Sequence, residues 1–386
     1  MPKKYLKRIV LLIEDVSTIS GIRTRTLKTV RNSGGRDVEY ICISAFNDKG
    51  NDIIDGFLGN CLTVGANTKE AIEVIKSWRP EDTVIWFSNK TLSRFPADVR
   101  KALEKFPLIF VGAGQLSFHI QNGRELQDLE FVQGLRASGV MLLSHLDKMT
   151  YNQFGIYGQK VGFNPVEIRN QNNWSFRDNR VPTYIGRISN GTKGTDRLIP
   201  IARFLANRSL GPLRVYTPSS STTSGELDRF LNIVRKEGVE DMIDIRFDER
   251  ELDVMLGQAS VVFLPSRQEA FGNVILEAYS YGVPVVSSAY APGPSELIAH
   301  GKTGFLFEEY NEAELENVFA TLEVEDIAHN ISACCFERHK DYAIEKYYTL
   351  IESYSAEILQ EFDGSNSKAI FPHIPRGPKT YTNACE

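Results

Sequence analysis

The sequence has 386 residues, of which 42% are apolar and 24% charged, as in an ordinary globular protein. A chain of this length exceeds a single ordinary core and predicts two domains of about 100–200 residues each. The formal net charge of −5 gives the chain no general attraction to nucleic acid.

The cysteines and the N-terminus indicate the compartment. Five cysteines, without a Cys-x-x-Cys pair, favour thiols in a reducing compartment over a disulfide framework or a zinc site. No apolar run approaches the ~18 residues that a membrane-spanning helix needs. The apolar run after the basic start is short and soon meets Glu14 and Asp15, so we expect no signal peptide and a cytoplasmic protein.

Residues 1–36 hold nine basic and two acidic side chains, a local charge of nine minus two, or +7. The basic residues are Lys3, Lys4, Lys7, Arg8, Arg23, Arg25, Lys28, Arg31 and Arg36. They form either a solvated face or a region attracted to an anionic surface. Peripheral contact with the inner face of a membrane is therefore a hypothesis.

The first half of the chain alternates between strands and helices. Apolar runs predict strands at residues 8–13, 38–44, 83–87, 108–111 and 139–143. A helical stretch is predicted after Ser20-Gly21 and through Arg31, and further helices at residues 69–78 and 97–105. This alternation is typical of a parallel sheet that helices cover on both faces.

A polar stretch with Asn-Pro interrupts this pattern, and the alternation then restarts. Strands are predicted at residues 182–188, 213–216, 243–247, 260–265, 283–287 and 304–307. Helices are predicted at residues 196–207, 226–237, 251–258, 271–281 and 343–360. The resulting fold class is α/β with two doubly wound, Rossmann-like domains.

We place the domain boundaries where the pattern changes. The prediction is an N-terminal domain at 1–165, a linker at 166–182, a second domain at 183–340, a helix within 341–362 and an irregular tail at 363–386.

Ligands of open α/β sheets bind at the carboxyl ends of the strands, so the strand-to-helix junctions carry the information. The first junction of the second domain contains Gly186, Arg187, Gly191, Lys193 and Gly194. Glycines permit close backbone approach, and the two cations suit a diphosphate, whose charge grows as its bond to a sugar breaks. The alternative is a glycine-rich surface loop with two solvated cations.

The second junction runs from Pro265-Ser266 through Glu269, Phe271, Gly272, Asn273 and Val274 to Glu277. The first amides of the predicted helix have no partner within the helix and can hold phosphate oxygens. Glu269 is predicted at the turn before the helix, and Glu277 follows it by eight residues, or ~12 Å along a helix. One carboxylate would accept hydrogen bonds from a sugar and the other from ribose hydroxyls. For Glu277 alone, the alternative is a half-exposed helical glutamate.

The third junction is Pro292-Gly293-Pro294-Ser295-Glu296, followed by Gly301-Lys302-Thr303-Gly304. Its amides could face the same ligand, or Ser295 could simply cap a helix. In this order and at these spacings, the three segments resemble family-4 retaining glycosyltransferases of the GT-B fold, strongly over residues 183–307. This resemblance implies two domains that face a central cleft, with the last helix crossing back to the first domain.

The resemblance also implies roles for particular residues. Arg187 and Lys193 would bind the diphosphate, Glu269 the donor sugar and Glu277 the ribose. The donor-binding set is Gly186, Arg187, Lys193, Glu269, Phe271, Gly272, Asn273, Val274 and Glu277. In the first domain, the family's glycine-rich acceptor loop matches only in part, at Ser20 and Gly21. The family's histidine near the donor sugar is best matched by His119, with His145 as a rival; a lone histidine is more often structural.

The chain contains no Asp-x-Asp. Because Arg187, Lys193 and a helix N-terminus supply positive charge, we predict catalysis without a metal or other cofactor. The predicted activity is transfer of a hexose-type sugar, with retention, from a nucleotide-diphosphate sugar, in family terms a UDP-sugar. The expected acceptor is a glycan or lipid-linked saccharide, as in surface polysaccharide synthesis. An epimerase, a phosphorylase or a non-catalytic nucleotide-sugar-binding protein remain alternatives.

Overall fold

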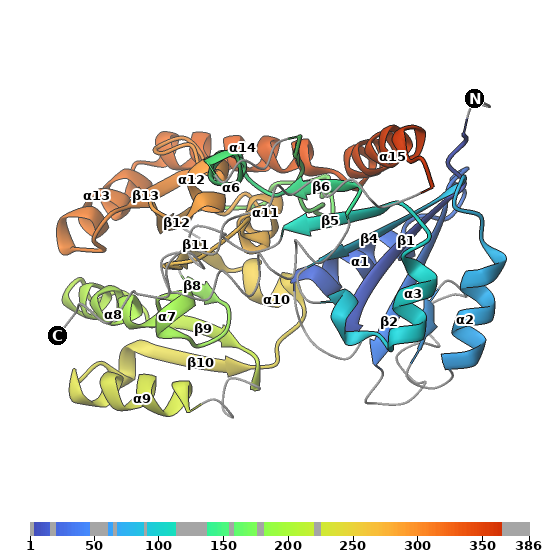
Figure 1. Cartoon of the computed structure of the whole chain (residues 1–386). Coiled ribbons are helices and arrows are strands. Elements are labelled where there is room, and N and C mark those ends of the chain that lie inside the picture. The colour runs from blue at the N-terminus through green and yellow to red at the C-terminus, as the bar shows by residue number, and fades with distance from the viewer. Residues whose placement is uncertain are drawn as a thin grey trace. The chain divides into compact units, whose positions relative to one another are not determined.

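The computed structural model describes residues 4–15, 21–46, 61–64, 68–88, 91–112, 137–153, 158–175, 181–219 and 225–364 (Figure 1). The chain forms two compact units. Unit 1 comprises Met1–Asn164 together with Ile344–Glu386, and unit 2 comprises Pro165–Ala343. The C-terminal helix therefore belongs to the same unit as the N-terminus.

Unit 1 is built on a parallel sheet whose order, among the described residues, is β3-β2-β1-β4-β5-β6-β7. Order reverses between β1 and β4, the mark of a doubly wound sheet. The strands are β1 (Arg8–Asp15), β2 (Glu39–Phe46), β3 (Cys61–Thr63), β4 (Thr83–Ser88), β5 (Leu108–Gly112), β6 (Gly139–Leu142) and β7 (Lys160–Val161). The helices are α1 (Gly21–Arg31), α2 (Thr68–Ser77), α3 (Ala97–Leu103), α6 (His145–Gln153) and α15 (Ile344–Glu361).

Helices cover both faces of this sheet. Ile85 and Phe87 of β4 point into one buried cluster with residues of α2 and α3, which lie side by side (Figure 1). The alternate residue Trp86 faces α15 and donates a 2.9 Å hydrogen bond to Ser355. All six residues of β4 are buried, which explains why residues 84–87 form a continuous apolar run without alternation.

Helix α15 is joined to unit 1 by polar as well as apolar contacts. Glu352 accepts hydrogen bonds from the Arg36 guanidinium at 2.8 Å and the Tyr40 hydroxyl at 2.7 Å. The Tyr354 hydroxyl accepts from the Val140 amide at 2.9 Å and donates to the Val140 carbonyl at 3.1 Å. Burial raises the pKa of Tyr354 to about 12, so its proton stays available to donate.

Unit 2 repeats the same topology, with described strand order β10-β9-β8-β11-β12-β13, all parallel. The strands are β8 (Val181–Ile185), β9 (Leu213–Thr217), β10 (Ile243–Phe247), β11 (Ala259–Leu264), β12 (Val285–Ser288) and β13 (Gly304–Phe307). The helices are α7 (Asn190–Lys193), α8 (Leu198–Asn207), α9 (Glu226–Lys236), α10 (Leu252–Leu256), α11 (Asn273–Ser280), α12 (Pro292–Leu297), α13 (Glu312–Glu323) and α14 (Glu325–His339). Order reverses here between β8 and β11.

The predicted fold class, two doubly wound α/β units with a final helix that returns to the first, is confirmed. Within the predicted linker, the described part packs into unit 2. Trp174 is buried there and its indole donates a 3.0 Å hydrogen bond to the Ala259 carbonyl. None of the described helices has the length and apolar content to cross a bilayer.

Several members of the basic N-terminal set are engaged inside unit 1. Arg8 pairs with Glu39 at 2.7 Å, Arg36 pairs with Glu352, and Lys4 donates to the Leu359 carbonyl. The local charge of the sequence therefore overstates the free positive charge of this region. Membrane contact stays a prediction that would rest on the remaining basic side chains.

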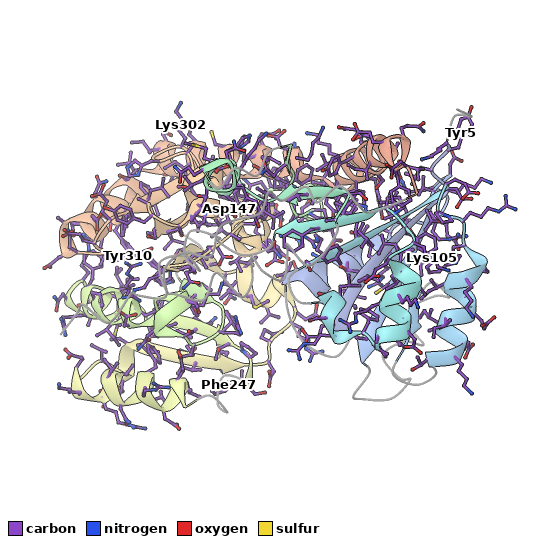
Figure 2. The ribbon with its side chains drawn as sticks, in the orientation of Figure 1. Tyr5, Lys105, Asp147, Phe247, Lys302 and Tyr310 are labelled. Atoms are coloured by element: carbon purple, nitrogen blue, oxygen red, sulfur yellow. The ribbon has the colours of Figure 1, made fainter. Side chains whose placement is uncertain are left out.

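Replacing Tyr354 by Phe should destabilise unit 1, because it leaves the Val140 amide and carbonyl without their buried partner. We expect a loss of about 1–3 kcal/mol in the free energy of unfolding. Urea unfolding followed by circular dichroism measures it. The control is Tyr5→Phe, since Tyr5 is 67% exposed (Figure 2). Equal unfolding midpoints for the two variants would contradict this role of α15.

Candidate functional site

The candidate site of unit 2 lies where the strand order reverses. Strands β8 and β11 are neighbours, and the chain leaves them toward opposite sides of the sheet. Loops at the carboxyl ends of two such strands diverge and leave room for a ligand. The loops that follow β8 and β11 are the first two junctions singled out in the sequence.

These two loops are held together by their backbones. The Thr192 carbonyl accepts hydrogen bonds from the amides of Arg267 and Gln268, at 3.0 and 3.1 Å. Gly194 has φ +61°, and a Cβ built on it would lie 2.1 Å from the Pro265 carbonyl oxygen. Glycine is required here both by the left-handed backbone and by the close approach.

Lys193 and Glu269 meet at this junction. The Lys193 ammonium lies 2.6 Å from the Glu269 carboxylate, and the two side chains are only 21% and 17% exposed. Residues 76 positions apart thus form a half-buried ion pair. A cation and an acceptor-only carboxylate side by side could bind a phosphate and an adjacent hydroxyl-bearing group.

Arg187 lies near the same point, around the buried Tyr184. The Tyr184 hydroxyl donates a 2.7 Å hydrogen bond to the Arg187 carbonyl. Burial raises the pKa of Tyr184 well above its usual range; the negative charge of Glu269 adds to this rise and the positive charge of Arg187 opposes it. A Cβ at Gly186 would lie 2.7 Å from that hydroxyl, so the glycine leaves space for it.

Helix α11 begins later than the sequence predicts. It starts at Asn273, not at residue 271, because Gly272 adopts φ +93° as its N-cap. Glu269 lies in the loop before the helix, as predicted. Since the helix starts four residues later, the ~12 Å estimate for its distance from Glu277 along a helix does not hold. Asn273 and Val274 supply the first amides of the helix, which have no earlier carbonyl within it. Glu277 is half-buried, one turn further along.

The third junction packs directly on the second. The Gly293 amide, in α12, donates a 3.0 Å hydrogen bond to the Glu269 carbonyl. A Cβ at Gly293 would lie 2.4 Å from the carbonyl oxygen of Phe271, which is itself 4% exposed. The loops after β8, β11 and β12 therefore converge around Glu269.

Two supporting arginines were not identified from the sequence. Arg267 forms a two-pronged ion pair with Asp196, at 2.6 and 2.7 Å, and also donates to the Asn190 carbonyl. Arg197 donates a 3.0 Å hydrogen bond to the Pro265 carbonyl. Both fix one loop to the other. The partners of each arginine lie about 70 residues away in the sequence, so their contacts could not be predicted from local pattern. The one local signal was the dipeptide Asp196-Arg197, which follows the glycine loop.

Of the four site residues predicted in unit 1, the structure describes Gly21 and His145. His119 and Ser20 lie outside the described residues, and Gly21 is the first residue of α1. His145 begins α6 and is exposed. The roles predicted for these four residues stay predictions.

Residues 167–332 match the family model described as glycosyl transferases group 1. The resemblance predicted from the three junctions is thereby confirmed at the level of this domain.

An uncharacterized glycosyltransferase of Haemophilus influenzae is 26% identical over 154 residues, 39% of this chain and 42% of that protein. A D-inositol 3-phosphate glycosyltransferase of Corynebacterium aurimucosum is 33% identical over 33% of this chain and 31% of that protein. The chain thus spans less than half the length of these relatives.

Solved structures resemble the chain over nearly its whole length. Anabaena HepE in complex with UDP and glucose superposes with a TM-score of 0.70 at 17% identity, covering 92% of this chain and 99% of that one. TarM superposes with a TM-score of 0.74 at 11% identity, covering 93% of this chain and 100% of that one. At these identities the similarity establishes the shared GT-B fold.

Replacing Gly194 by Ala should disrupt the junction. The left-handed backbone costs an L-residue about 1–2 kcal/mol, and the overlap with Pro265 forces a further shift. We expect unit 2 to lose about 2–4 kcal/mol of unfolding free energy in urea titrations. The matched control is Gly191→Ala in the same loop, where no described atom lies within 4 Å of a built Cβ. If both variants unfold alike, the close approach does not constrain the loop.

Proposed function

We propose that this chain, which carries a glycosyl transferases group 1 domain over residues 167–332, transfers a hexose-type sugar from a UDP-sugar to a saccharide acceptor. The observation that carries the proposal is the 2.6 Å contact between Lys193 and Glu269. In a nucleotide-sugar, the diphosphate and the sugar are joined by one bond. A cation and a carboxylate in contact would lie on the two sides of that bond, with the cation at the phosphate and the carboxylate at the sugar hydroxyls.

The donor would lie on unit 2, along the junctions described above. Lys193 and Arg187 would neutralise the diphosphate, and the first amides of α11 would add donors at the positive end of a helix dipole. Glu269 would accept hydrogen bonds from the sugar, and Glu277 from the ribose. The complex of HepE with UDP and glucose supports a UDP-sugar as donor.

The reaction we propose breaks the bond between the anomeric carbon and the phosphate oxygen, and forms one between that carbon and an acceptor oxygen on the same face. The acceptor proton passes to the departing phosphate oxygen, so the anomeric configuration is retained. Arg187 and Lys193 stabilise the charge that grows on the phosphate. Glu269 positions the sugar without a covalent intermediate.

For the acceptor, we propose a glycan or lipid-linked saccharide of a surface polysaccharide. A relative in Streptomyces coelicolor, 34% identical over 21% of this chain, is named an exopolysaccharide phosphotransferase. The match covers 9% of that protein, and its name supports a role in exopolysaccharide synthesis.

The donor test is a panel of UDP- and GDP-sugars, read as released nucleoside diphosphate, without and then with a saccharide acceptor mixture. We expect turnover with a UDP-hexose, and proton NMR of the product should show the anomer of the donor. Lys193→Ala should lower turnover by about 10²–10³-fold, as removal of one preorganised donor to a developing anion does elsewhere. Glu269→Gln should also lower turnover, because it removes the carboxylate that would accept hydrogen bonds from the sugar.

The matched controls are Lys236→Ala and Glu312→Gln, which change exposed residues of unit 2 outside the three junctions and should leave turnover unchanged. Donor binding without release or transfer of sugar would instead favour a non-catalytic nucleotide-sugar-binding protein. If the control variants lose as much turnover as Lys193→Ala and Glu269→Gln, the ion pair has no special role in the reaction.

We also propose that turnover needs no metal ion, because Arg187, Lys193 and the start of α11 already place positive charge at the diphosphate. Turnover in excess EDTA should stay within about twofold of the untreated enzyme. Lys193→Ala should not be rescued by adding Mg²⁺ or Mn²⁺. Activity that disappears in EDTA and returns with either ion would refute metal independence while leaving the donor site in place.

A further inference from the structure

Unit 1 contains a buried arginine that the donor site does not use. Arg25 of α1 is 7% exposed, and its guanidinium donates a 3.1 Å hydrogen bond to the neutral amide oxygen of Asn164. Among the described residues, no carboxylate forms an ion pair with it. A guanidinium stays protonated in proteins, so this is a buried positive charge without a described counter-charge.

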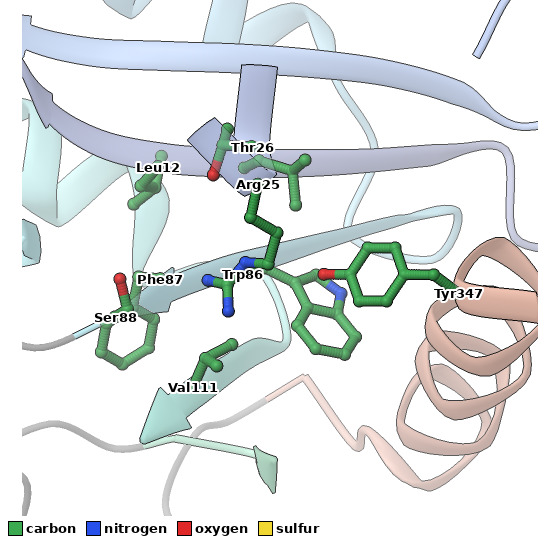
Figure 3. A pocket seen from close by; sticks show the side chains of 9 residues that line it. Leu12, Arg25, Thr26, Trp86, Phe87, Ser88, Val111 and Tyr347 are labelled. Carbon is green, nitrogen blue, oxygen red and sulfur yellow. The ribbon is translucent and has the colours of Figure 1, made fainter. Parts of the chain in front are cut away.

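The guanidinium points into a small pocket (Figure 3). Of the described residues that line it, Arg25 alone is charged; the others are Leu11, Leu12, Thr26, Trp86, Phe87, Ser88, Val111 and Tyr347. The Tyr347 side chain is 2% exposed, and its raised pKa comes from burial, opposed by the positive charge of Arg25. The pocket therefore combines apolar walls with one strong donor group.

A second polar group in the same pocket also lacks a described partner. Ser88, the last residue of β4, is 1% exposed, and its hydroxyl makes no hydrogen bond to a described residue. Buried hydroxyls are normally satisfied, so an unpaired one beside an uncompensated cation indicates a missing acceptor. The cavity among the described residues measures ≈ 10 Å³, which is room for about one oxygen atom.

The pocket lies between β1, β4 and β5, where the strand order of unit 1 reverses. The same topology that places the donor junctions in unit 2 thus provides a second binding position in unit 1. Here the chain offers a guanidinium and a hydroxyl, and the described residues offer no carboxylate. Both groups can donate to the oxygens of one anion.

We propose that Arg25 and Ser88 bind an oxyanion of the acceptor, a phosphate or carboxylate group, with one oxygen entering the pocket. The assignment to the acceptor rests on the proposed function; the oxyanion site itself does not. The acceptor is then an anionic saccharide, such as a sugar phosphate or a uronic acid. The corresponding neutral sugar should bind with lower affinity.

The test is calorimetric titration of the full chain with glucose 6-phosphate, glucuronate and glucose, in saturating UDP to occupy any phosphate site of unit 2. At least one anionic sugar should bind, and the one that does identifies phosphate or carboxylate as the recognised group. Glucose should bind at least ~10-fold more weakly. Arg25→Gln should lower anion affinity by ~10–100-fold, the usual effect of removing a charged hydrogen-bond partner.

Arg31→Gln, at an exposed position of the same helix, is the control and should bind the anions as the wild type does. Ser88→Ala should fold normally and lose part of the anion affinity, which keeps the test valid if Arg25→Gln fails to fold. Equal affinity for glucose and the anions, or anion binding that neither Arg25→Gln nor Ser88→Ala reduces, would overturn the site.

The two proposals can fail separately. UDP binding by Arg25→Gln should equal that of the wild type, because the donor junctions lie in unit 2. If UDP-sugars are not turned over but anion binding still depends on Arg25, the proposed function falls and the oxyanion site stands. If turnover is normal and anion binding ignores Arg25, this inference falls and the proposed function stands.

Discussion

The approach of Gly194 to the carbonyl of Pro265 is the constraint on which the rest of the donor junction depends. A side chain at residue 194 would sit 2.1 Å from that oxygen, so the loops after β8 and β11 can meet only over a glycine. Once they meet, the Thr192 carbonyl can accept from two amides of the opposite loop. Arg197 and Arg267 then tie the same loops through longer side chains.

The fixed backbone also holds Lys193 and Glu269 close enough to form their ion pair. Lys193 precedes Gly194 directly, and Glu269 is held on its other side by the Gly293 amide. Because the backbone already holds the two residues close together, pairing costs mainly the rotamer freedom of the two side chains. A half-buried lysine that already faces a carboxylate binds phosphate only by exchanging or sharing that partner. The pair thus keeps the cation in place before a ligand arrives, at some cost in affinity.

The sequence predicted the features that depend on local pattern. Continuous apolar runs marked the buried strands, and glycines and cations at strand ends marked the three junctions. It could not distinguish Gly194 from Gly191, because only the partner 71 residues away makes one of them indispensable. The start of α11 was misplaced since Gly272 is compatible with a helix but here takes a left-handed backbone. Arg25 was counted as surface charge, because burial of a cation depends on tertiary packing.

The two units show how one topology can serve different ligands. Both sheets reverse order between their first and fourth strands, so each offers loops at the same relative position. In unit 2, Lys193 at that position already faces a carboxylate of its own chain before a ligand binds. In unit 1, the cation meets only a neutral amide among the described residues. A cation paired with a carboxylate suits a ligand that brings both phosphates and hydroxyls, whereas an uncompensated cation favours a ligand that brings negative charge. The strand order thus fixes where each unit can bind, and the charge of a few side chains determines what it binds.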